Sequence, residues 1–425
     1  MKAPVLWITP WFPHPPIDGA RVASQSLLRS LSNLGEEIVV AALSPTEIEI
    51  SSLQAFEQEC GILRSTIIPI SSKYSLNTLR YLWNAPFTYA RFFTPKILTT
   101  LENLIVSMPW KAVVAEGLHT ATIASRIVTS KTSLPFIYRA QNAESELWNQ
   151  NSTFLSSIPL CFRPIIRPIV RFEAKRVAQL ESSVCHLASK ILTVSDVDAK
   201  ILSKWCCDNC PPVTVPVGFS FPKPPKWEKD DTLRLLFIGR LDWPPNRDGL
   251  SWFLTEIWPY VLSTRQNIHL TIAGSGAGRW LNNYKTMHNI EILSHLKNVA
   301  PIYSKCHLAI VPVRFGSGVR VKTIEAAQFG RPCLSTTIGT MGIPLTHDYS
   351  ALISDDTDEW RKLITTISVE SLEELGQQAW TSLRDYCNDS RSATDCQKII
   401  NQISDHKIVS NLDKKDLSCV PSRGA

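Results

Sequence analysis

The chain has 425 residues, of which 44% are hydrophobic and 19% are charged, and its formal net charge is +6 at pH 7. This length exceeds what one ordinary hydrophobic core accommodates, and the composition excludes a wholly disordered chain. The modest positive charge does not indicate a nucleic-acid-binding protein, in which basic residues cluster, but it suits a protein that handles anionic ligands or approaches an anionic membrane. We therefore expect two domains and no nucleic-acid partner.

The N-terminal segment and the cysteines bear on the cellular setting. Prolines interrupt the apolar start MKAPVLWITPWFPHPP before it reaches the length of a signal peptide, and no apolar stretch is long enough to span a bilayer. The eleven cysteines have no regular spacing, and no second pair follows WCCDNC (205–210) to complete a zinc site. We expect a cytoplasmic protein with reduced thiols and no metal.

The first half of the chain alternates strand and helix patterns. Strands are predicted at 5–8, 37–43, 111–117, 134–140 and 190–195. Helices are predicted at 21–34, 119–131 and 172–188. Repeated β-α-β units imply a parallel sheet with right-handed crossovers.

The segment FSFPKPPKWEKDD (219–231) is rich in proline and charge and lacks periodicity, which is typical of a linker. The alternation then begins again, with strands predicted at 233–241, 268–274, 289–293, 307–313 and 332–337. Two α/β units joined by a linker imply two open parallel sheets that face each other across a cleft, with ligand at the carboxyl ends of the strands.

The domain boundaries follow from these patterns. We predict an N-terminal Rossmann-like domain over 1–218, the linker over 219–231, a second Rossmann-like domain over 232–365, C-terminal helices over 366–403 that pack back toward the first domain, and a disordered tail over 404–425.

The stretch FGSGVRVKTIEAAQFGRP (315–332) combines glycines, basic side chains and a carboxylate at the start of a predicted helix. Gly316 and Gly318 permit a tight turn with exposed N–H groups. A helix that starts after such a turn attracts phosphate through its unpaired N–H groups and the positive end of its dipole. The stretch therefore indicates an anion site.

Two side chains of this helix share one face. Lys322 and Glu325 are three residues apart, whereas Arg320 points in a different direction. Lys322 is therefore the expected phosphate contact, and Glu325 suits the hydroxyls of a ribose. The arrangement favours a nucleoside diphosphate site, and the alternative is a glycine turn followed by a surface Lys–Glu pair.

A second basic element follows the first strand of the second half. In FIGRLDWPPNRDG (237–249), Arg240 stands just beyond the strand, and Asn246 and Arg247 precede the next helix. A guanidinium at this edge can hold pyrophosphate oxygens in a bidentate grip. The alternative is that Arg240 only ties loops together.

These segments resemble the retaining glycosyltransferases of family 4, which have the GT-B fold. The matching features are GRLDWPPN, IHLTIAGSG, HLAIVPV and GSGVRVKTIEAAQFGRPCLSTTIGTMGI. The pattern is most similar to the bacterial exopolysaccharide branch, in which G-x-G-x-R-x-K-x-x-E-A opens the helix. Weaker matches in the first half are PPIDGARVASQSLL, RAQNAESELW and TVSDVDA.

The resemblance implies a division of roles between the domains and among the residues. The second domain is expected to bind the nucleotide sugar and the first to take the acceptor. The implied catalytic residues are Arg240 and Lys322 at the diphosphate and His119 at the donor sugar. The implied donor-binding residues are Gly19, Ala20, Asn246, Arg247, Gly316, Ser317, Gly318, Val319, Arg320 and Glu325. The residues expected on the acceptor side are Arg139, Asn142 and Glu144.

Some of these assignments have structural alternatives. Ser317 stands where the family often has a glutamate eight residues before Glu325, and Arg247 stands near the place of a common lysine. His119 alternatively packs as a structural histidine. Gly19 alternatively belongs to an ordinary loop before a helix, and Arg139 with its neighbours alternatively braces a loop.

The predicted function is transfer of a sugar, with retention, from a nucleoside diphosphate sugar to a hydroxyl of a glycan or lipid-linked glycan, as in polysaccharide or glycoconjugate biosynthesis. The donor is a substrate, and no cofactor or metal is expected. Two alternatives remain open at this point, a nucleotide-sugar epimerase of the same fold and a non-catalytic nucleotide-sugar binder. A dinucleotide dehydrogenase is disfavoured because neither half has the glycine fingerprint with its acidic partner.

Aromatic and basic residues interleave in two segments, 73–93 and 161–176. Such surfaces lie in a membrane interface or bind a lipid-linked acceptor. The prolines at 164 and 168 argue against a simple amphipathic helix, and the alternative is an edge that packs its aromatic residues inward. The sequence leaves open a peripheral contact with the inner face of a membrane.

Overall fold

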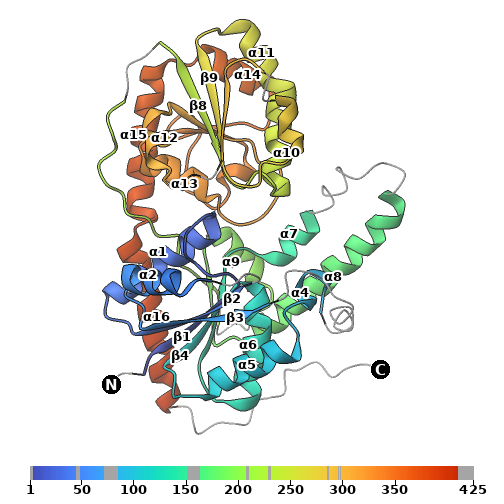
Figure 1. Ribbon diagram of the computed structural model, residues 1–425, viewed down its shortest axis with the longest axis vertical. Helices are drawn as coiled ribbons and strands as arrows, with labels where there is room; N and C mark the ends of the chain where they lie inside the picture. Colours follow the sequence, from blue (N-terminus) through green and yellow to red (C-terminus); the bar gives the residue numbers. More distant parts are fainter. Residues whose placement is uncertain are drawn as a thin grey trace.

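A computed structural model of the chain describes residues 3–44, 48–70, 85–150, 163–206, 210–227, 231–284, 287–294, 296 and 298–409. The chain forms two α/β units, one above the other in Figure 1. The lower unit, blue to green, comes from the first half of the chain, and the upper unit, yellow to orange, comes from the second half.

The first unit is built on a seven-stranded sheet in which all strands are parallel, in the order β3-β2-β1-β4-β5-β6-β7. The strands are β1 (Val5–Thr9), β2 (Ile38–Ser44), β3 (Arg64–Pro69), β4 (Ala112–Glu116), β5 (Phe136–Ala140), β6 (Lys190–Thr193) and β7 (Val213–Thr214). The central strands β1 and β4 are buried at every residue, as a parallel sheet covered on both faces requires. The strand order reverses between β1 and β4, so the loops after these two strands flank a crevice.

Helices cover both faces of this sheet. They are α1 (Gly19–Asn33), α2 (Ile50–Cys60), α4 (Phe87–Ala90), α5 (Pro95–Val106), α6 (Gly117–Lys131), α7 (Glu144–Gln150), α8 (Arg163–Leu187) and α9 (Asp196–Ser203). α1 starts at Asp18, whose carboxylate accepts the Arg21 N–H at 3.0 Å. α8 starts nine residues before the predicted helix and continues through Pro168, so the prolines in this segment do not end it.

The second unit has a six-stranded parallel sheet in the order β10-β9-β8-β11-β12-β13. The strands are β8 (Leu233–Ile238), β9 (Ile268–Ala273), β10 (Ile290–Leu293), β11 (Leu308–Val311), β12 (Cys333–Ser335) and β13 (Leu352–Ile353). Its helices are α10 (Pro244–Trp252), α11 (Trp258–Thr264), α12 (Ala300–Lys305), α13 (Val321–Gln328) and α14 (Thr357–Thr366). The order reverses between β8 and β11, which places the second crevice at the loops after those strands.

The helical segment between β8 and β9 is interrupted. A π-helical turn (Phe253–Ile257) separates α10 from α11. Pro259 lies at the start of α11 and has no N–H for the α-helical pattern, which gives a physical reason for the wider turn.

The chain crosses between the units twice at one place. α15 (Val369–Tyr386) packs against α13 of the second unit, and α16 (Asp389–Val409) packs against α1 of the first. The first crossing, at Phe219, bonds to the second: the Phe219 N–H donates to the Cys387 carbonyl at 2.6 Å, and the Asp389 N–H donates to the Phe219 carbonyl at 3.3 Å. Residues 410–425 of the predicted tail lie outside the described residues.

Two parallel sheets, each in a Rossmann-like order, confirm the predicted fold class. None of the described helices is both long enough and apolar enough to cross a membrane.

Candidate active site

The residues singled out in the sequence lie on loops and helix starts at the carboxyl ends of the strands. His119 follows β4 and Gly19 follows the loop after β1, at the reversal in the first sheet. Arg240 follows β8, and the 316–325 segment follows β11, at the reversal in the second sheet. Topology therefore gathers residues that are up to 300 positions apart, at roughly the place where open α/β sheets bind ligands.

Lys322 lies against the end of β8. Its Nζ donates to Asn246 Oδ1 at 2.9 Å and stands 4.2 Å from the centre of the Phe237 ring. Gly239 leaves room for this side chain, because a Cβ built there would lie 2.9 Å from Nζ. Burial, and then the charge of Arg320, lower the pKa of Lys322 to about 7, while neighbouring Glu325 opposes the shift.

Glu325 lies on the same face of α13 as Lys322. The buried Tyr303 hydroxyl donates to its Oε2 at 3.4 Å. Burial raises the pKa of this carboxyl to about 7, opposed by the Tyr303 hydrogen bond and by the charge of Lys322. The Glu325 carboxyl and the Lys322 amine therefore lie side by side, each only partly ionised near neutral pH.

Arg240 is joined to Lys322 through one side chain. The Asn246 Nδ2 donates to the Arg240 carbonyl at 2.8 Å while its oxygen accepts from Lys322. The Arg240 guanidinium points to solvent, is 44% exposed and pairs with Asp242 at 2.9 Å. The Asp242 bond is the main reason why the pKa of Arg240 is raised, and the charge of Asp18 in the first unit contributes.

Arg247 lies on the exposed side of α10. Its guanidinium stands 5.5 Å from the centre of the Trp280 ring, at the start of a 3-10 helix (Arg279–Tyr284) of the second unit. The structure therefore gives Arg247 a stacking partner within the second unit.

Arg320 is partly buried near the junction of the two units. Its Nη1 donates to the Ser317 and Gly318 carbonyls at 2.6 and 3.1 Å. Its Nε and Nη2 are buried and have no hydrogen-bond partner in the part of the chain that the structure describes. Burial lowers its pKa to about 10, opposed by the negative charge of Asp198 in the first unit.

The glycine turn after β11 contacts the first unit. The Gly316 N–H donates to Gln150 Oε1 at 3.1 Å, so this N–H is not exposed as the sequence suggested. Ser317 is 6% exposed; its Oγ donates to the Ala143 carbonyl at 3.3 Å and accepts from Asn142 Nδ2 at 3.5 Å. The Ser317 side chain therefore holds the two units together.

The first turns of α1 and α13 abut across the gap. A Cβ built on Gly19 would lie 2.9 Å from both Cβ and Cγ2 of Val321. The absence of a side chain at Gly19 thus allows the two helix starts to meet. Val319 lies beside Gly342, where a Cβ would lie 3.5 Å from Val319 Cγ2 and 2.7 Å from the Cβ of Ser195, the residue before α9 of the first unit.

His119 is half-buried among three aromatic rings. The ring centres of Tyr89, Phe92 and Trp11 lie 4.6, 4.9 and 6.4 Å from its own. Burial, aided by the charge of Arg91, lowers the pKa of His119 to about 3. The imidazole is therefore neutral at neutral pH and is held rigidly at the start of α6.

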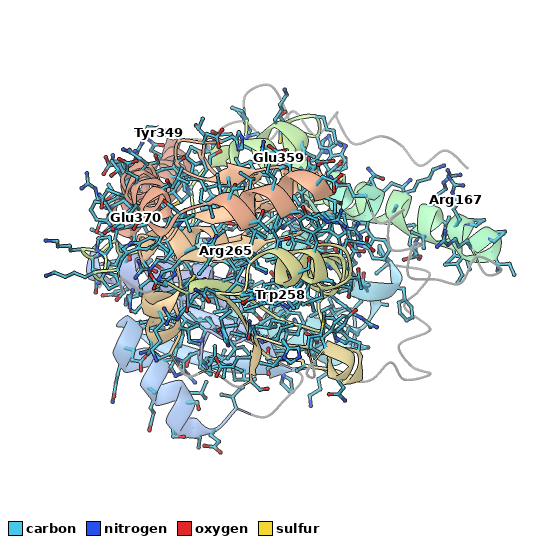
Figure 2. The ribbon with its side chains drawn as sticks, turned by 90° about the horizontal axis from the view of Figure 1, so that it is seen from above. Arg167, Trp258, Arg265, Tyr349, Glu359 and Glu370 are labelled. Atoms are coloured by element: carbon cyan, nitrogen blue, oxygen red, sulfur yellow. The ribbon has the colours of Figure 1, made fainter. Side chains whose placement is uncertain are left out.

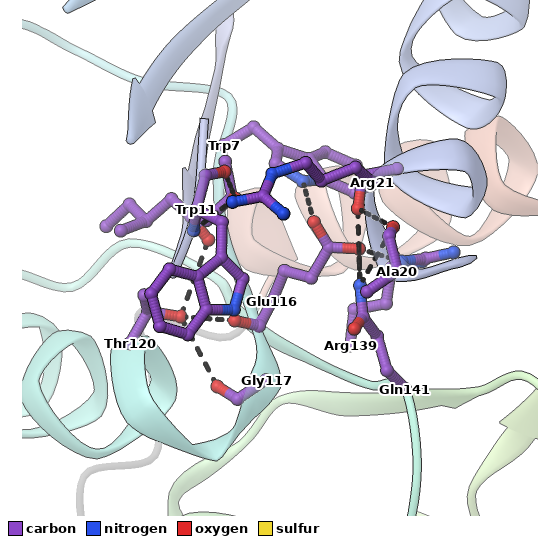
Figure 3. Close-up of polar contacts among 12 residues, drawn as sticks. Trp7, Trp11, Ala20, Arg21, Glu116, Gly117, Thr120, Arg139 and Gln141 are labelled. Carbon is purple, nitrogen blue, oxygen red and sulfur yellow. Dashed lines mark hydrogen bonds and ion pairs between the residues drawn. The ribbon is translucent and has the colours of Figure 1, made fainter. Parts of the chain in front are cut away.

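Arg139 is buried in β5, with 1% of its side chain exposed, and it forms an ion pair with the fully buried Glu116 of β4 (Figure 3). Glu116 also accepts from Trp7 Nε1 at 3.4 Å and from Gln141 Nε2 at 2.9 Å. The same Gln141 amide donates to the Ala20 carbonyl at 3.5 Å. This network favours the bracing alternative for Arg139, because it fixes the start of α1 against the first crevice.

The loop that contains Asn142 and Glu144 is held by two buried carboxylates. Asp198 accepts the Ala143 N–H at 2.9 Å, and Glu181 accepts the Glu144 N–H at 2.9 Å. Burial, and then the charge of Glu181, raise the pKa of Glu144 to about 7. Sequence reasoning missed Asp198 and Glu181; the only signal for Asp198 is the segment TVSDVDA, and Glu181 has none.

No group of three or more His, Cys, Asp or Glu side chains in the described ranges is arranged to hold a metal ion. The cysteines of these ranges for which a state is assigned are free thiols.

Comparisons with known proteins agree with this geometry. Residues 232–368, which run from β8 to the end of α14, match the family described as glycosyl transferases group 1. An uncharacterized 44.6 kDa protein in the cps region of Klebsiella pneumoniae is 22% identical over 402 residues, covering 88% of this chain and 93% of the relative.

Solved structures share the two-unit fold at low sequence identity. Sucrose-phosphate synthase from Thermosynechococcus elongatus matches with a TM-score of 0.70 and 12% identity, covering 95% of this chain and all of that one. HepE of Anabaena, in complex with UDP and glucose, matches with a TM-score of 0.65 and 10% identity, covering 94% of this chain and 100% of that one. TarM of S. aureus, in complex with ligands that include UDP, matches with a TM-score of 0.67 and 8% identity, covering 94% of this chain and 100% of that one.

The family match selects the transferase over the epimerase that the sequence left open. Residues 232–368 match the group 1 glycosyltransferases, and the two facing parallel sheets give the chain the GT-B fold of the solved structures; the protein is a glycosyltransferase that takes its sugar from a nucleotide-sugar donor.

Proposed function

We propose that this enzyme transfers a sugar, with retention at the anomeric carbon, from a nucleoside diphosphate sugar to a hydroxyl of a glycan or lipid-linked glycan. The observation that carries the proposal is the Lys322 ammonium, held by Asn246 at the carboxyl end of β8 beside the abutting starts of α1 and α13. A cation and two helix starts at one place form a site suited to a diphosphate.

Lys322 is the group that stabilises the departing diphosphate. Its pKa of about 7 leaves it partly neutral in the free enzyme, and a bound diphosphate favours its charged form. Charge that develops on the leaving group then meets a cation already in position, which lowers the barrier without reorganisation. Arg240 supplies a second cation by exchanging its exposed Asp242 partner for a phosphate oxygen.

The remaining residues take positions around this centre. Glu325 accepts hydrogen bonds from the ribose hydroxyls, since its Oε2 is already oriented by Tyr303. Neutral His119 and the aromatic rings around it form the wall of the first crevice and contact the sugars. The acceptor attacks from the face that the diphosphate leaves, which gives retention.

The biological setting rests on one relative. The Klebsiella protein that matches over most of both chains is described by its place in the cps region. We therefore place the enzyme in polysaccharide or glycoconjugate synthesis on the cytoplasmic side of a membrane, with no cofactor and no nucleic-acid partner.

Two steps test the proposal. Thermal-shift measurements with UDP-, GDP- and ADP-sugars first identify the donor, because a specific ligand stabilises only the folded form. Transfer of labelled sugar is then compared between the native enzyme and Lys322→Ala. We expect turnover to fall at least about tenfold, which corresponds to about 1.4 kcal/mol of barrier.

The matched control is Lys305→Ala, which removes an exposed lysine from the same unit at the end of α12. This variant is expected to keep full activity, and EDTA is expected to leave transfer unchanged. Full activity in Lys322→Ala, with the donor identified and the control intact, would rule out the proposed site.

A further inference from the structure

The outer half of α8 projects from the first unit. α8 has buried residues only from Ala174 onward, at Ala174, Val177, Leu180, Glu181, Val184 and Cys185. The segment 163–173 has none and extends away from the body in Figure 1. Figure 2 shows Arg167 far out on this helix, beyond the rest of the unit.

One face of the projecting segment carries large apolar side chains. Ile165, Ile169 and Phe172 are 67%, 58% and 62% exposed. Their spacing of four and three residues aligns them on a single side of the helix. Isolated exposed apolar residues are common on protein surfaces, but an aligned stripe of three on a projecting helix marks an interaction surface.

Basic side chains form a line on another side of the same helix. Arg167, Arg171 and Lys175 are exposed and recur every fourth residue, so they form a second line along the helix. Residues 163–176 contain five basic side chains and one glutamate, Glu173, which is paired with Arg176 at 2.8 Å. The projecting segment therefore carries a strong positive charge.

The base of the projection is anchored to a fixed point. Arg176 Nη2 donates to the Ala85 carbonyl at 2.6 Å, and the Phe87 N–H donates to Glu173 at 2.7 Å. Phe87 is itself 43% exposed beside this base. These contacts hold α8 in a set direction, so its apolar stripe is presented at a fixed angle to the active site.

We propose that the segment 163–173 of α8 docks the enzyme on the surface of an anionic lipid bilayer, with Ile165, Ile169 and Phe172 among the lipid headgroups and acyl chains and the basic line on lipid phosphates. A helix that lies in the interface in this way combines an apolar face with arginines and lysines beside it. The inference does not depend on the proposed acceptor, because binding to vesicles requires no transfer.

A bilayer fits this surface better than a second copy of the chain. In a two-fold dimer each patch meets an identical patch, so the basic lines of two copies would repel each other. A stable protein interface buries about 800 Å² on each partner, which is more than three side chains on one helix supply. An anionic bilayer has neither restriction.

Co-flotation of the full chain with vesicles tests this proposal. Vesicles made of equal parts phosphatidylcholine and phosphatidylglycerol are compared with phosphatidylcholine alone, at low salt and at about 0.5 M salt, where the charges are screened. We expect binding to the anionic vesicles at low salt, weaker binding at high salt, and little binding to the neutral vesicles.

Three variants identify the surface. Ile165→Ser/Ile169→Ser/Phe172→Ser is expected to lower the bound fraction by roughly tenfold or more, and Arg167→Glu/Arg171→Glu/Lys175→Glu to abolish the preference for anionic lipid. The matched control Ile50→Ser/Leu63→Ser/Val106→Ser removes side chains that are 72%, 59% and 52% exposed elsewhere on the first unit and is expected to float like the native protein.

Each variant is checked for folding by circular dichroism and for stabilisation by the donor. No flotation of the native protein, or unchanged flotation of the apolar variant, overturns the proposal. A dimer in sedimentation velocity that is lost in the apolar variant, without flotation, overturns it in favour of self-association. Loss of flotation in the apolar variant supports the proposal if that variant still transfers sugar to a soluble acceptor. This outcome is independent of the test of Lys322.

Discussion

Lys322 and Glu325 illustrate how burial prepares single residues for chemistry. Each is a charged type that ordinarily titrates far from neutrality, and for both the largest cause of the shift is the loss of water around the charge. Their pKa values meet at about 7 from opposite directions. Both side chains therefore change protonation state near physiological pH, where the binding of a diphosphate shifts these protonation equilibria.

The pH dependence of kcat/KM for the donor follows from these two pKa values. Above pH 7 the free enzyme loses the Lys322 proton and its attraction for the diphosphate, and below pH 7 Glu325 gains a proton and no longer accepts from hydroxyls as a carboxylate. Since kcat/KM reports the free enzyme, we expect a bell centred near pH 7 that falls about tenfold per pH unit on each side. Initial rates at low donor concentration across pH 5–9 measure it.

Lys322→Arg separates the two limbs of this profile. A guanidinium stays charged throughout, so the alkaline limb is expected to disappear while the acid limb of Glu325 remains. The shape of the curve is compared, not its height, because arginine is the larger side chain. An unchanged alkaline limb in this variant would assign that limb to another group.

At the scale of elements, the starts of α1 and α13 are the feature that most constrains the site. They abut because Gly19 has no side chain where Val321 approaches it. Adding one methyl group to a packed contact costs about 1–3 kcal/mol. Gly19→Ala is therefore expected to push the helix starts apart and lower kcat/KM for the donor by a factor of roughly 5 to 150.

A second substitution restores the space. In Gly19→Ala/Val321→Ala the methyl group enters the volume that valine leaves, so most of the lost activity is expected to return, with Val321→Ala alone as the control. Donor titrations followed by thermal shift are expected to rank the affinities of these variants in the same order as their activities. Equal losses in the single Gly19 variant and the double variant would show that the contact between the two helices is not the cause.

Most strands could be predicted from the sequence, because a buried strand is local in its pattern, whereas β3 and the helices α2, α5, α7 and α9 of the first unit were not predicted. β1, β4 and β8 occupy the expected segments to within a few residues. The start of α8 was missed because Pro164 and Pro168 argue against a helix; Pro164 lies in the first turn, which tolerates proline, and Pro168 lies inside the helix. β13 was missed because two residues leave no periodicity.

The site was predictable only in part, for a physical reason. Lys322 and Glu325 lie one turn apart on a helix, and their spacing alone places them together. The Arg139–Glu116 ion pair joins two strands, and the Ser317 contact joins two units. Pairings of this kind depend on the strand order and on the relative placement of the units, which no local pattern contains.

At the scale of the whole molecule, the two units are joined at three places. These are the two chain crossings, which bond to each other at Phe219, the turn after β11, where Ser317 and Gly316 bond to the first unit, and the contact between the starts of α1 and α13. The crossings are covalent and remain whatever happens at the other two places. The turn and the α1–α13 contact are therefore the places where the gap can open.

Ser317→Glu tests this arrangement and at the same time restores the glutamate that the family often has. Ser317 is 6% exposed and its Oγ lies 3.3 Å from the Ala143 carbonyl, so a larger, charged side chain in its place faces an oxygen of the first unit. Forcing a larger side chain into a packed contact costs about 1–3 kcal/mol, and separating the units avoids that cost. We expect a larger radius of gyration by small-angle scattering with the folded units intact, while Ser317→Ala, which loses only weak hydrogen bonds, keeps the native value. If the glutamate variant keeps the native dimensions and its activity rises, the glutamate reaches the donor without disturbing the contact, and the spacing of the units is set by the crossings alone.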